Sequence, residues 1–329
     1  MSDTIFPGYD PNFLSTPYTV PLPQLSADQQ ADTLTEPEHP DGLFPHANYT
    51  VAVSASRRLA WFSAANLDAT LFQPVTRRQL TSYWRREKNL PKENLVTGGW
   101  YKLSEKKLQR GHMTPADCME WGSDPTDAIL NANSTFYFSN AVPQIQRLNG
   151  GEWGLLERYI GEECAKASNG RLCVQTGPVL QANDPLYIYR LLGQSLQIPV
   201  LFWKAIWYFD PEGRLCRIGF LMSQSNLLQK SGLLQVESAS RAARMPGPFE
   251  QLGDYKTYQV GVETLQQLTG LELAGATREP YPGERPVELL LKEIDVPAAF
   301  DPATGQGVAE RGLLPIGKKT LRILVGLEL

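Results

Sequence analysis

One histidine of the chain has neighbours that could support acid–base chemistry on a phosphate group. The sequence holds three histidines: His39 and His46 lie in a proline-rich stretch, and His112 lies in the segment QRGHMTP. A neutral imidazole accepts a proton near pH 7, and the guanidinium of Arg110 can bind a phosphate through two parallel hydrogen bonds. A lone histidine is more often structural. The preceding residues, Arg110 and Gly111, are what favour a catalytic role for His112.

Three motifs follow one another along the chain: QRGHMTP at 109–115, SNAVPQ at 139–144 and LNGGEWGLLE at 148–157. They resemble the DRGH, SNxxPQ and LNxGxWxxLE motifs of the DNA/RNA non-specific endonucleases, which are ββα-metal, or His-Me finger, nucleases. The segments AWFSAANLD, LCVQTGPVL, IPVLFWK and TYQVGVETLQQLTGL are similar to other parts of that family, so the resemblance covers about residues 45–272. It implies a metal-dependent endonuclease that hydrolyses phosphodiester bonds of DNA, RNA or both and leaves 5′-phosphate ends.

The resemblance also implies roles for single residues. His112 would be the general base, Arg110 a clamp on the phosphate, Asn149 the sole direct protein ligand of Mg²⁺, and Glu157 the residue that orients metal-bound water. Mn²⁺ is expected to substitute. Mg²⁺ keeps most of its hydration shell and needs few protein ligands, so one amide oxygen suffices. Eight residues of helix span about 12 Å, so we expect Asn149 just before a helix, as its N-cap. The alternatives are simple capping for Asn149, a solvated carboxylate for Glu157 and a surface ion pair for Arg110.

Other residues are expected to support the site. Asn140 and Gln144 would brace the loop and the histidine. The acidic residue that opens the family motif is Gln109 here, and loss of such a partner typically lowers activity about 10 to 100-fold. This replacement supports an alternative function, a weakened nuclease-like domain that binds nucleic acid or a protein. The family also uses an upstream arginine, for which the sequence offers four candidates: Arg77, Arg78, Arg85 and Arg86.

The elements that must position these residues predict an α+β fold. Residues 49–68 are expected to form two strands joined by a hairpin, and RLCVQTGPVL, IPVLFWKAIWYF and RIGFLMS three further antiparallel strands, with a turn at PEGR. Between them we expect a helix-like stretch from Ala128, a β-prone TFYFSN, a loop at AVPQ and an amphipathic helix from about Gly151. Residues 260–268 are expected to be helical, and KKTLRILVGLEL is a candidate strand. The prediction is a ββα-metal nuclease fold around a central, mostly antiparallel twisted sheet.

Charge and composition divide the chain further. Residues 1–45 hold eight prolines, seven acidic residues and no lysine or arginine, which predicts an extended strap that either packs on the sheet or competes with nucleic acid. Residues 46–275 would be the endonuclease domain, and residues 276–329 a C-terminal extension whose role the sequence does not indicate. Residues 77–110 hold ten lysines and arginines and three glutamates, typical of a solvated face or of a surface for a DNA or RNA backbone.

The remaining features exclude some classes of protein. No run reaches the roughly 18 apolar residues of a membrane-spanning helix, and the N-terminus does not resemble a signal peptide, so we expect a cytoplasmic protein or export by another route. The four cysteines form no CxxC pair, which favours free thiols over a zinc site. A small-molecule phosphodiesterase is a third candidate function. An inhibitor or immunity protein as partner, a homodimer, and the choice between DNA and RNA stay open.

Overall fold

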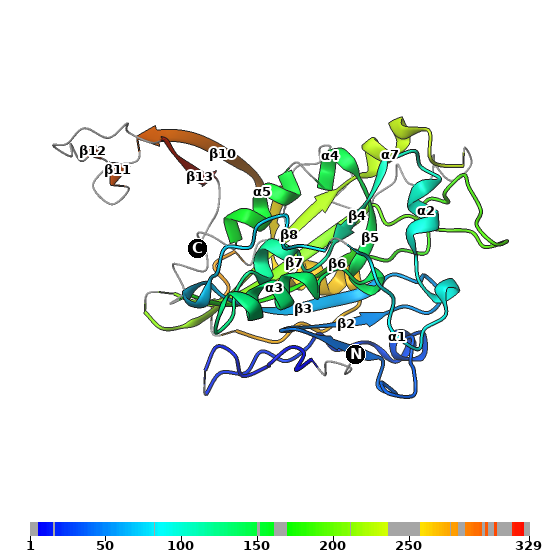
Figure 1. The fold of residues 1–329 in the computed structure, drawn as a ribbon, viewed down its shortest axis with the longest axis horizontal. Coiled ribbons are helices and arrows are strands. Elements are labelled where there is room, and N and C mark those ends of the chain that lie inside the picture. Colours follow the sequence, from blue (N-terminus) through cyan, green and yellow to red (C-terminus); the bar gives the residue numbers. More distant parts are fainter. Residues whose placement is uncertain are drawn as a thin grey trace.

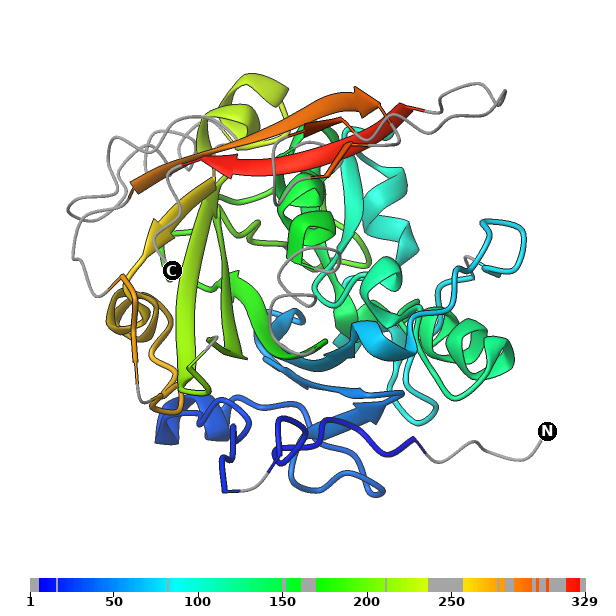
Figure 2. The same cartoon turned by 90° about the vertical axis from the view of Figure 1, so that its left-hand side faces the viewer.

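Nine strands form one sheet in the computed structural model of the chain (Figures 1 and 2). Their order across the sheet is β1 (Leu43–His46), β2 (Tyr49–Val53), β3 (Ala60–Asp68), β6 (Arg171–Val179), β7 (Leu201–Phe209), β8 (Leu215–Ser223), β9 (Thr257–Val260), β10 (Val287–Pro297) and β13 (Lys318–Val325). Every neighbouring pair is antiparallel. The α+β class with a large antiparallel sheet is therefore confirmed.

The structure describes most of the chain. The described residues are 6–15, 17–81, 83–149, 152–160, 170–210, 212–235, 257–276, 278–281, 287–297, 300–301, 306–307 and 318–325. Within them, no helix is long and apolar enough to cross a membrane. Cys118, Cys173 and Cys216 are buried free thiols, as expected, and Cys164 lies outside the described residues.

The central strands are buried on both faces because different elements cover each face. Alternate side chains of a strand point to opposite sides. Asn66 and Gln175 bond the N-terminal strap, whereas Ala65, Leu67 and Val174 line a cavity beneath helix α5 (Glu152–Tyr159). In Figure 1, α5 and α3 (Pro125–Asn133) lie in front of the sheet, and Figure 2 shows α9 (Val262–Thr269) on the other side.

The strap, residues 6–42, packs against the sheet. Tyr9, Leu14, Val20 and Leu34 are buried in the main core. The expectation that the strap contains no helix is wrong, because residues 27–31 form the short helix α1 (Ala27–Ala31) behind a capping box made by its preceding serine. The last residues of the predicted strap belong to the edge strand β1, where a proline is tolerated because one side of the strand needs no ladder hydrogen bonds.

A separate two-stranded sheet carries the first two motifs. Strand β4 (Leu108–His112) pairs antiparallel with β5 (Ala141–Ile145), and α4 (Gln146–Asn149) and α5 follow. The predicted loop at AVPQ is wrong, since these residues form β5, and the β-prone TFYFSN holds the 3-10 turn η4 (Phe138–Asn140). Pro143 fits a strand here because the side chain of Gln224 bonds the outer edge of β5, at the Pro143 carbonyl (3.0 Å) and the Ile145 amide (2.8 Å).

Other sequence predictions are confirmed. The hairpin of β2 and β3, the three strands β6, β7 and β8, and the helix α9 all form where they were expected, and the C-terminal tail supplies β13. The described residues also form the helices α2 (Gly98–Lys102) and α7 (Ser225–Ser231), and β11 (Phe300–Asp301) pairs with β12 (Gln306–Gly307). The expected turn at PEGR lies partly outside the described residues because Pro211 is not among them.

Candidate active site

A cleft of about 420 Å³ lies at the end of β4 and brings together residues from distant parts of the chain. Its polar lining comes from β4, from the 3-10 turn η3 (Ala116–Met119), from α5 and from the segment before the first motif. The residues concerned are Arg77, Gln109, Arg110, His112, Asp117 and Glu157. Five of these six were candidate site residues from the sequence, and Asp117 is the addition.

His112 is the last residue of β4 and is half-buried in the cleft wall. Its ring lies 4.6 Å from the ring of Trp84 and 5.0 Å from that of Phe136. Burial lowers the pKa of His112 from 6.5 to about 4, so the imidazole is neutral at pH 7. Within the described part of the chain, its Nε2 has no hydrogen-bond partner. A neutral imidazole with a free ring nitrogen is the form that accepts a proton.

The loop after His112 is held by the buried side chain of Asn140. Its Oδ1 accepts from the Thr114 amide (2.9 Å), and its Nδ2 donates to the carbonyls of Thr114 (2.8 Å) and Thr135 (3.0 Å). In addition, the Met113 amide donates to the Asn140 carbonyl (2.9 Å). Asn140 does not line the cleft, so its position suits the bracing role expected from the sequence.

Gln144 braces β4 from the neighbouring strand. A Cβ atom added at Gly111 would lie 2.0 Å from Gln144 Oε1, so the glycine leaves the space that the glutamine side chain fills. This glycine is therefore needed for packing between β4 and β5, rather than for approach of a substrate. Gln109 lines the cleft, and its Nε2 donates to the Lys106 carbonyl (2.9 Å).

Arg110 points its guanidinium toward aromatic rings rather than toward an acid. Its Cζ lies 5.7 Å from the centroid of Trp84 and 5.5 Å from that of Tyr101. Among the described residues, no acidic side chain forms an ion pair with Arg110, and its Nε has no hydrogen-bond partner. This arrangement leaves the donors of the guanidinium available to an anion in the cleft.

The four upstream arginines have different surroundings. Arg77 lines the cleft. Arg85 donates to the Asn133 carbonyl (2.5 Å) and lies 4.6 Å over the ring of Tyr137, and Arg86 donates to the Leu90 carbonyl (2.7 Å). Arg78 is exposed and does not line the cleft. The geometry therefore favours Arg77 as the upstream arginine of the site.

Glu157 reaches the cleft from α5 and has a partner that the sequence analysis missed. Its Oε1 lies 3.6 Å from Nζ of the buried Lys204. Burial raises the pKa of Glu157 to about 7, against the opposite effect of Lys204. The sequence signal for this pair was a single lysine inside the apolar run IPVLFWKAIWYF.

The structure describes the backbone of Asn149, the expected metal ligand, but not its side chain. Asn149 is the last residue of α4 and stands before Glu152, the first residue of α5, so it is not the N-cap of α5, and its side chain lies outside the described residues. No group of three or more histidine, cysteine or acidic side chains suited to a metal occurs in the described part of the chain. The Glu157 carboxyl and Nε2 of His112, which has no hydrogen-bond partner among the described residues, line one cleft. These polar groups suit the water shell of a Mg²⁺ ion, which needs few direct protein ligands.

Comparison with known proteins places this geometry in a family. Residues 31–279 match the sequence profile of the DNA/RNA non-specific endonucleases. The chain is 25% identical over 205 residues to a nuclease of Nostoc sp. (59% of this chain, 64% of that protein). It is 26% identical over 167 residues to human mitochondrial endonuclease G (47% of this chain, 54% of that protein). It is also 25% identical over 233 residues to the uncharacterized protein y4fB of Sinorhizobium fredii (67% of this chain, 33% of that protein).

The alignments cover less than two thirds of the length of each of these relatives. A solved EndoG/EndoGI complex is similar over 70% of this chain and 84% of the matched one, with a TM-score of 0.47 and 17% identity. The profile match includes all three motifs and every strand from β1 to β9. The chain therefore belongs to the DNA/RNA non-specific endonuclease family.

Proposed function

We propose that this protein is a metal-dependent endonuclease that hydrolyses phosphodiester bonds of DNA, RNA or both without base specificity and leaves 5′-phosphate ends. The observation that carries the proposal is the pairing, in one cleft, of a neutral His112 that has a free Nε2 with an Arg110 that has no acidic partner among the described residues. One supplies a proton acceptor and the other an anion-binding group. Phosphodiester hydrolysis needs both.

The side chains of the cleft suit an in-line displacement. Nε2 of His112 takes a proton from a water molecule as the water oxygen attacks phosphorus, and the 3′ oxygen leaves. Arg110 stabilises the negative charge that grows on the phosphoryl oxygens. Glu157, when ionised, accepts a hydrogen bond from water in the cleft and orients it. Mg²⁺ or Mn²⁺, held by Asn149, would supply further positive charge beside the phosphoryl and leaving oxygens.

The lining of the cleft supports cleavage without base recognition. Its cations, Arg77 and Arg110, suit phosphate oxygens, and phosphate contacts give affinity without sequence information. Gln109 replaces the acidic residue of the family motif. This exchange leaves the proposed general base His112, the phosphate-binding Arg110 and the water-orienting Glu157 in place. We therefore favour an active enzyme over a domain that only binds nucleic acid.

Digestion of supercoiled plasmid and of a long RNA tests the proposal. We expect cleavage of at least one substrate with Mg²⁺ or Mn²⁺, none with a chelator, and product ends that a ligase joins without prior phosphorylation. His112→Ala should lower turnover at least about 100-fold, because general-base catalysis is worth about 10² to 10⁴. His39→Ala, a change in the strap outside the cleft, is the matched control. Cleavage that survives both chelation and His112→Ala would refute the proposed mechanism.

A further inference from the structure

A fully buried lysine lies behind the cleft. Lys204 is near the middle of β7, and only 1% of its surface is exposed. Its Nζ lies 3.6 Å from Glu157 Oε1 and 4.9 Å from the ring centroid of Trp153, and both partners belong to α5. Burying an ammonium group in a sheet is unfavourable unless a partner compensates for the lost hydration. Both of these partners come from the helix that also supplies part of the cleft wall.

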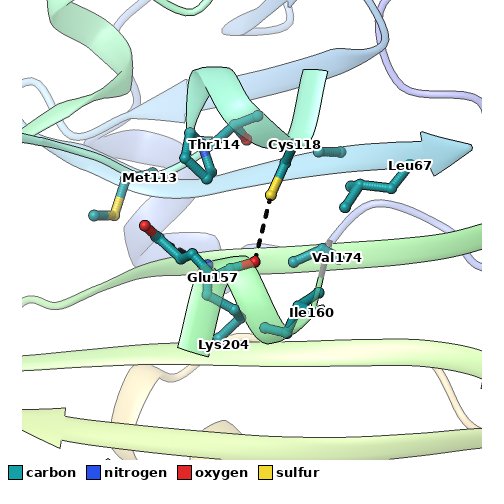
Figure 3. A pocket seen from close by; sticks show the side chains of 10 residues that line it. Leu67, Met113, Thr114, Cys118, Glu157, Ile160, Val174 and Lys204 are labelled. Atoms are coloured by element: carbon teal, nitrogen blue, oxygen red, sulfur yellow. Dashed lines mark hydrogen bonds and ion pairs between the residues drawn. The ribbon is translucent and has the colours of Figure 1, made fainter. Parts of the chain in front are cut away.

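Lys204 does not line the cleft that holds His112. It faces a separate cavity of about 10 Å³ between the sheet and α5, together with apolar side chains such as Leu67 and Val174 (Figure 3). This cavity is too small for a nucleotide. Glu157 lines both the small cavity and the cleft. Lys204 therefore has no direct route to a substrate and can influence the cleft through Glu157.

Several charged or titratable groups surround the Glu157 carboxyl. Asp117, from the 3-10 turn η3 (Ala116–Met119), acts to raise the pKa of Glu157, as burial does, and Lys204 from β7 acts to lower it. The Cys118 thiol, from the same turn, lies 3.9 Å from the Glu157 carbonyl (dashed line in Figure 3). Burial raises the pKa of that thiol, so it stays neutral. Among the described residues, Lys204 is the cation paired with this carboxylate.

We propose that Lys204 is a positioning residue, which holds the Glu157 carboxylate charged and directed at the cleft through their ion pair. The inference rests on the proposed hydrolytic function, in which Glu157 must be ionised to accept a hydrogen bond from water. Without Lys204, burial and Asp117 would be opposed only by the smaller effect of Trp153, among the described residues, so the pKa of Glu157 would rise further and the protonated form would dominate at neutral pH. A protonated carboxyl would donate a hydrogen bond instead of orienting water as an acceptor.

Lys204→Met and Lys204→Arg separate this role from a purely structural one. Methionine keeps much of the length of the side chain and removes the charge, whereas arginine keeps the charge. We expect the acidic limb of the kcat/KM profile to move to higher pH by at least about one unit in Lys204→Met, since one unit corresponds to a modest charge interaction. In Lys204→Arg, the acidic limb of the profile should stay close to its wild-type pH. In a Glu157→Gln background, Lys204→Met should cause no further shift. A folded Lys204→Met enzyme with an unshifted limb would overturn the inference.

A second measurement does not depend on activity or on metal. In the metal-free protein with ¹³C-labelled glutamate, the carboxyl resonance of Glu157, assigned by its loss in Glu157→Gln, should titrate at higher pH in Lys204→Met. Lys204→Gln also removes the charge with a shorter side chain, and it serves for this test should Lys204→Met fail to fold. If the Glu157 carboxyl does not respond to loss of the Lys204 charge, the inference is wrong. If it responds but the protein cleaves no nucleic acid, the proposed function fails and the ion-pair coupling stands.

Discussion

His46 and His112 are both packed between aromatic rings, yet their surroundings suit opposite roles. The ring of His46, in β1, lies 4.5 Å from that of Tyr49 and 4.5 Å from that of Tyr137. His46 is 3% exposed, and its Nε2 lies 3.5 Å from Glu87 Oε1. His112 has similar ring contacts, but it opens onto a cleft and lacks an acidic partner among the described residues. The aromatic packing is shared, so access and partner are what distinguish the two sites.

The two histidine sites are connected through the SNxxPQ motif. Ser139 Oγ donates to Glu87, the partner of His46, and the next residue, Asn140, holds the loop after His112. The motif thus contacts both the buried pair of His46 and Glu87 and the loop beside His112 at the cleft. We therefore expect residues around His46 to contribute mainly to stability, and His112 to contribute mainly through its proposed catalytic role.

Exchanging each histidine for alanine should separate the two roles most strongly. His46→Ala removes a buried ring whose Nε2 lies 3.5 Å from Glu87 Oε1, so we expect the free energy of unfolding to fall by about 2 to 4 kcal/mol. His112→Ala should change it by less than about 1 kcal/mol, because that ring is only half-buried and its Nε2 has no hydrogen-bond partner among the described residues, while turnover falls at least about 100-fold. Urea unfolding and plasmid digestion measure both quantities. A stable but inactive His46→Ala protein would break the comparison.

Much of the fold could be predicted from the sequence, because β-branched and aromatic runs mark the strands of the large sheet directly. Strand β5 could not, since Pro143 argues against a strand, and the side chain of Gln224 that replaces a neighbouring strand comes from far along the chain. Helix α1 was missed although Ser26 and Gln29 form a capping box. The many prolines of this segment favoured the prediction of an extended strap, although the capping box indicated a helix.

The site shows a similar division. The motifs identified His112, Arg110 and Glu157, and the structure brings these three residues into one cleft. The choice among four arginines could not be made, because it depends on which guanidinium is already occupied by a carbonyl or a ring. The partner of Glu157 could not be found either, since Lys204 meets it only when α5 packs on β7. Both failures concern contacts made by tertiary packing.

Two asparagines of the sequence motifs, Asn140 and Asn149, should respond differently to alanine. Asn140→Ala removes three side-chain hydrogen bonds that hold the loop after His112, so we expect a loss of about 2 to 3 kcal/mol in stability and little change in the metal dependence of the remaining activity. Asn149→Ala should raise the Mg²⁺ concentration for half-maximal activity at least about tenfold, because a proposed ligand is lost. Metal titrations and melting curves of both variants test this. Equal shifts in the two metal titrations would move the ligand elsewhere.

The pH dependence of stability should distinguish His112 from Glu157, because their pKa values are shifted by burial in opposite directions. The pKa of His112 is lowered from 6.5 to about 4 in the folded protein, so the unfolded chain binds more protons between these values. The stability from neutral His112 is present above pH 6.5 and is lost as pH falls toward 4. Glu157, with its pKa raised to about 7 from 4.5, acts in the opposite direction, and its contribution is lost as pH rises from 4.5 to 7.

Metal-free variants make these signs measurable. On acidification from pH 7 to pH 5, wild type should lose stability relative to His112→Ala and gain it relative to Glu157→Gln. Urea unfolding at several pH values gives both differences. Equal pH dependence in wild type and His112→Ala would show that the imidazole is not held neutral by burial.

The smallest expected effect concerns the basic segment, where neighbouring arginines differ in the same way as the two histidines. Arg77 lines the cleft, and no carbonyl or ring among the described residues contacts its guanidinium, whereas that of Arg85 donates to the Asn133 carbonyl and lies over the ring of Tyr137. Arg77→Ala should weaken binding of a catalytically inactive His112→Ala protein to nucleic acid by a few-fold. It should also reduce the slope of log affinity against log salt by about 0.9, the value for one lost phosphate contact.

Arg78→Ala, at an exposed neighbour outside the cleft, is the control for general charge and should change the slope less. Arg85→Ala should lower the melting temperature and leave the salt slope nearly unchanged. If Arg78→Ala and Arg77→Ala reduce the slope equally, the whole exposed segment holds the backbone, and the cleft gives Arg77 no special contact.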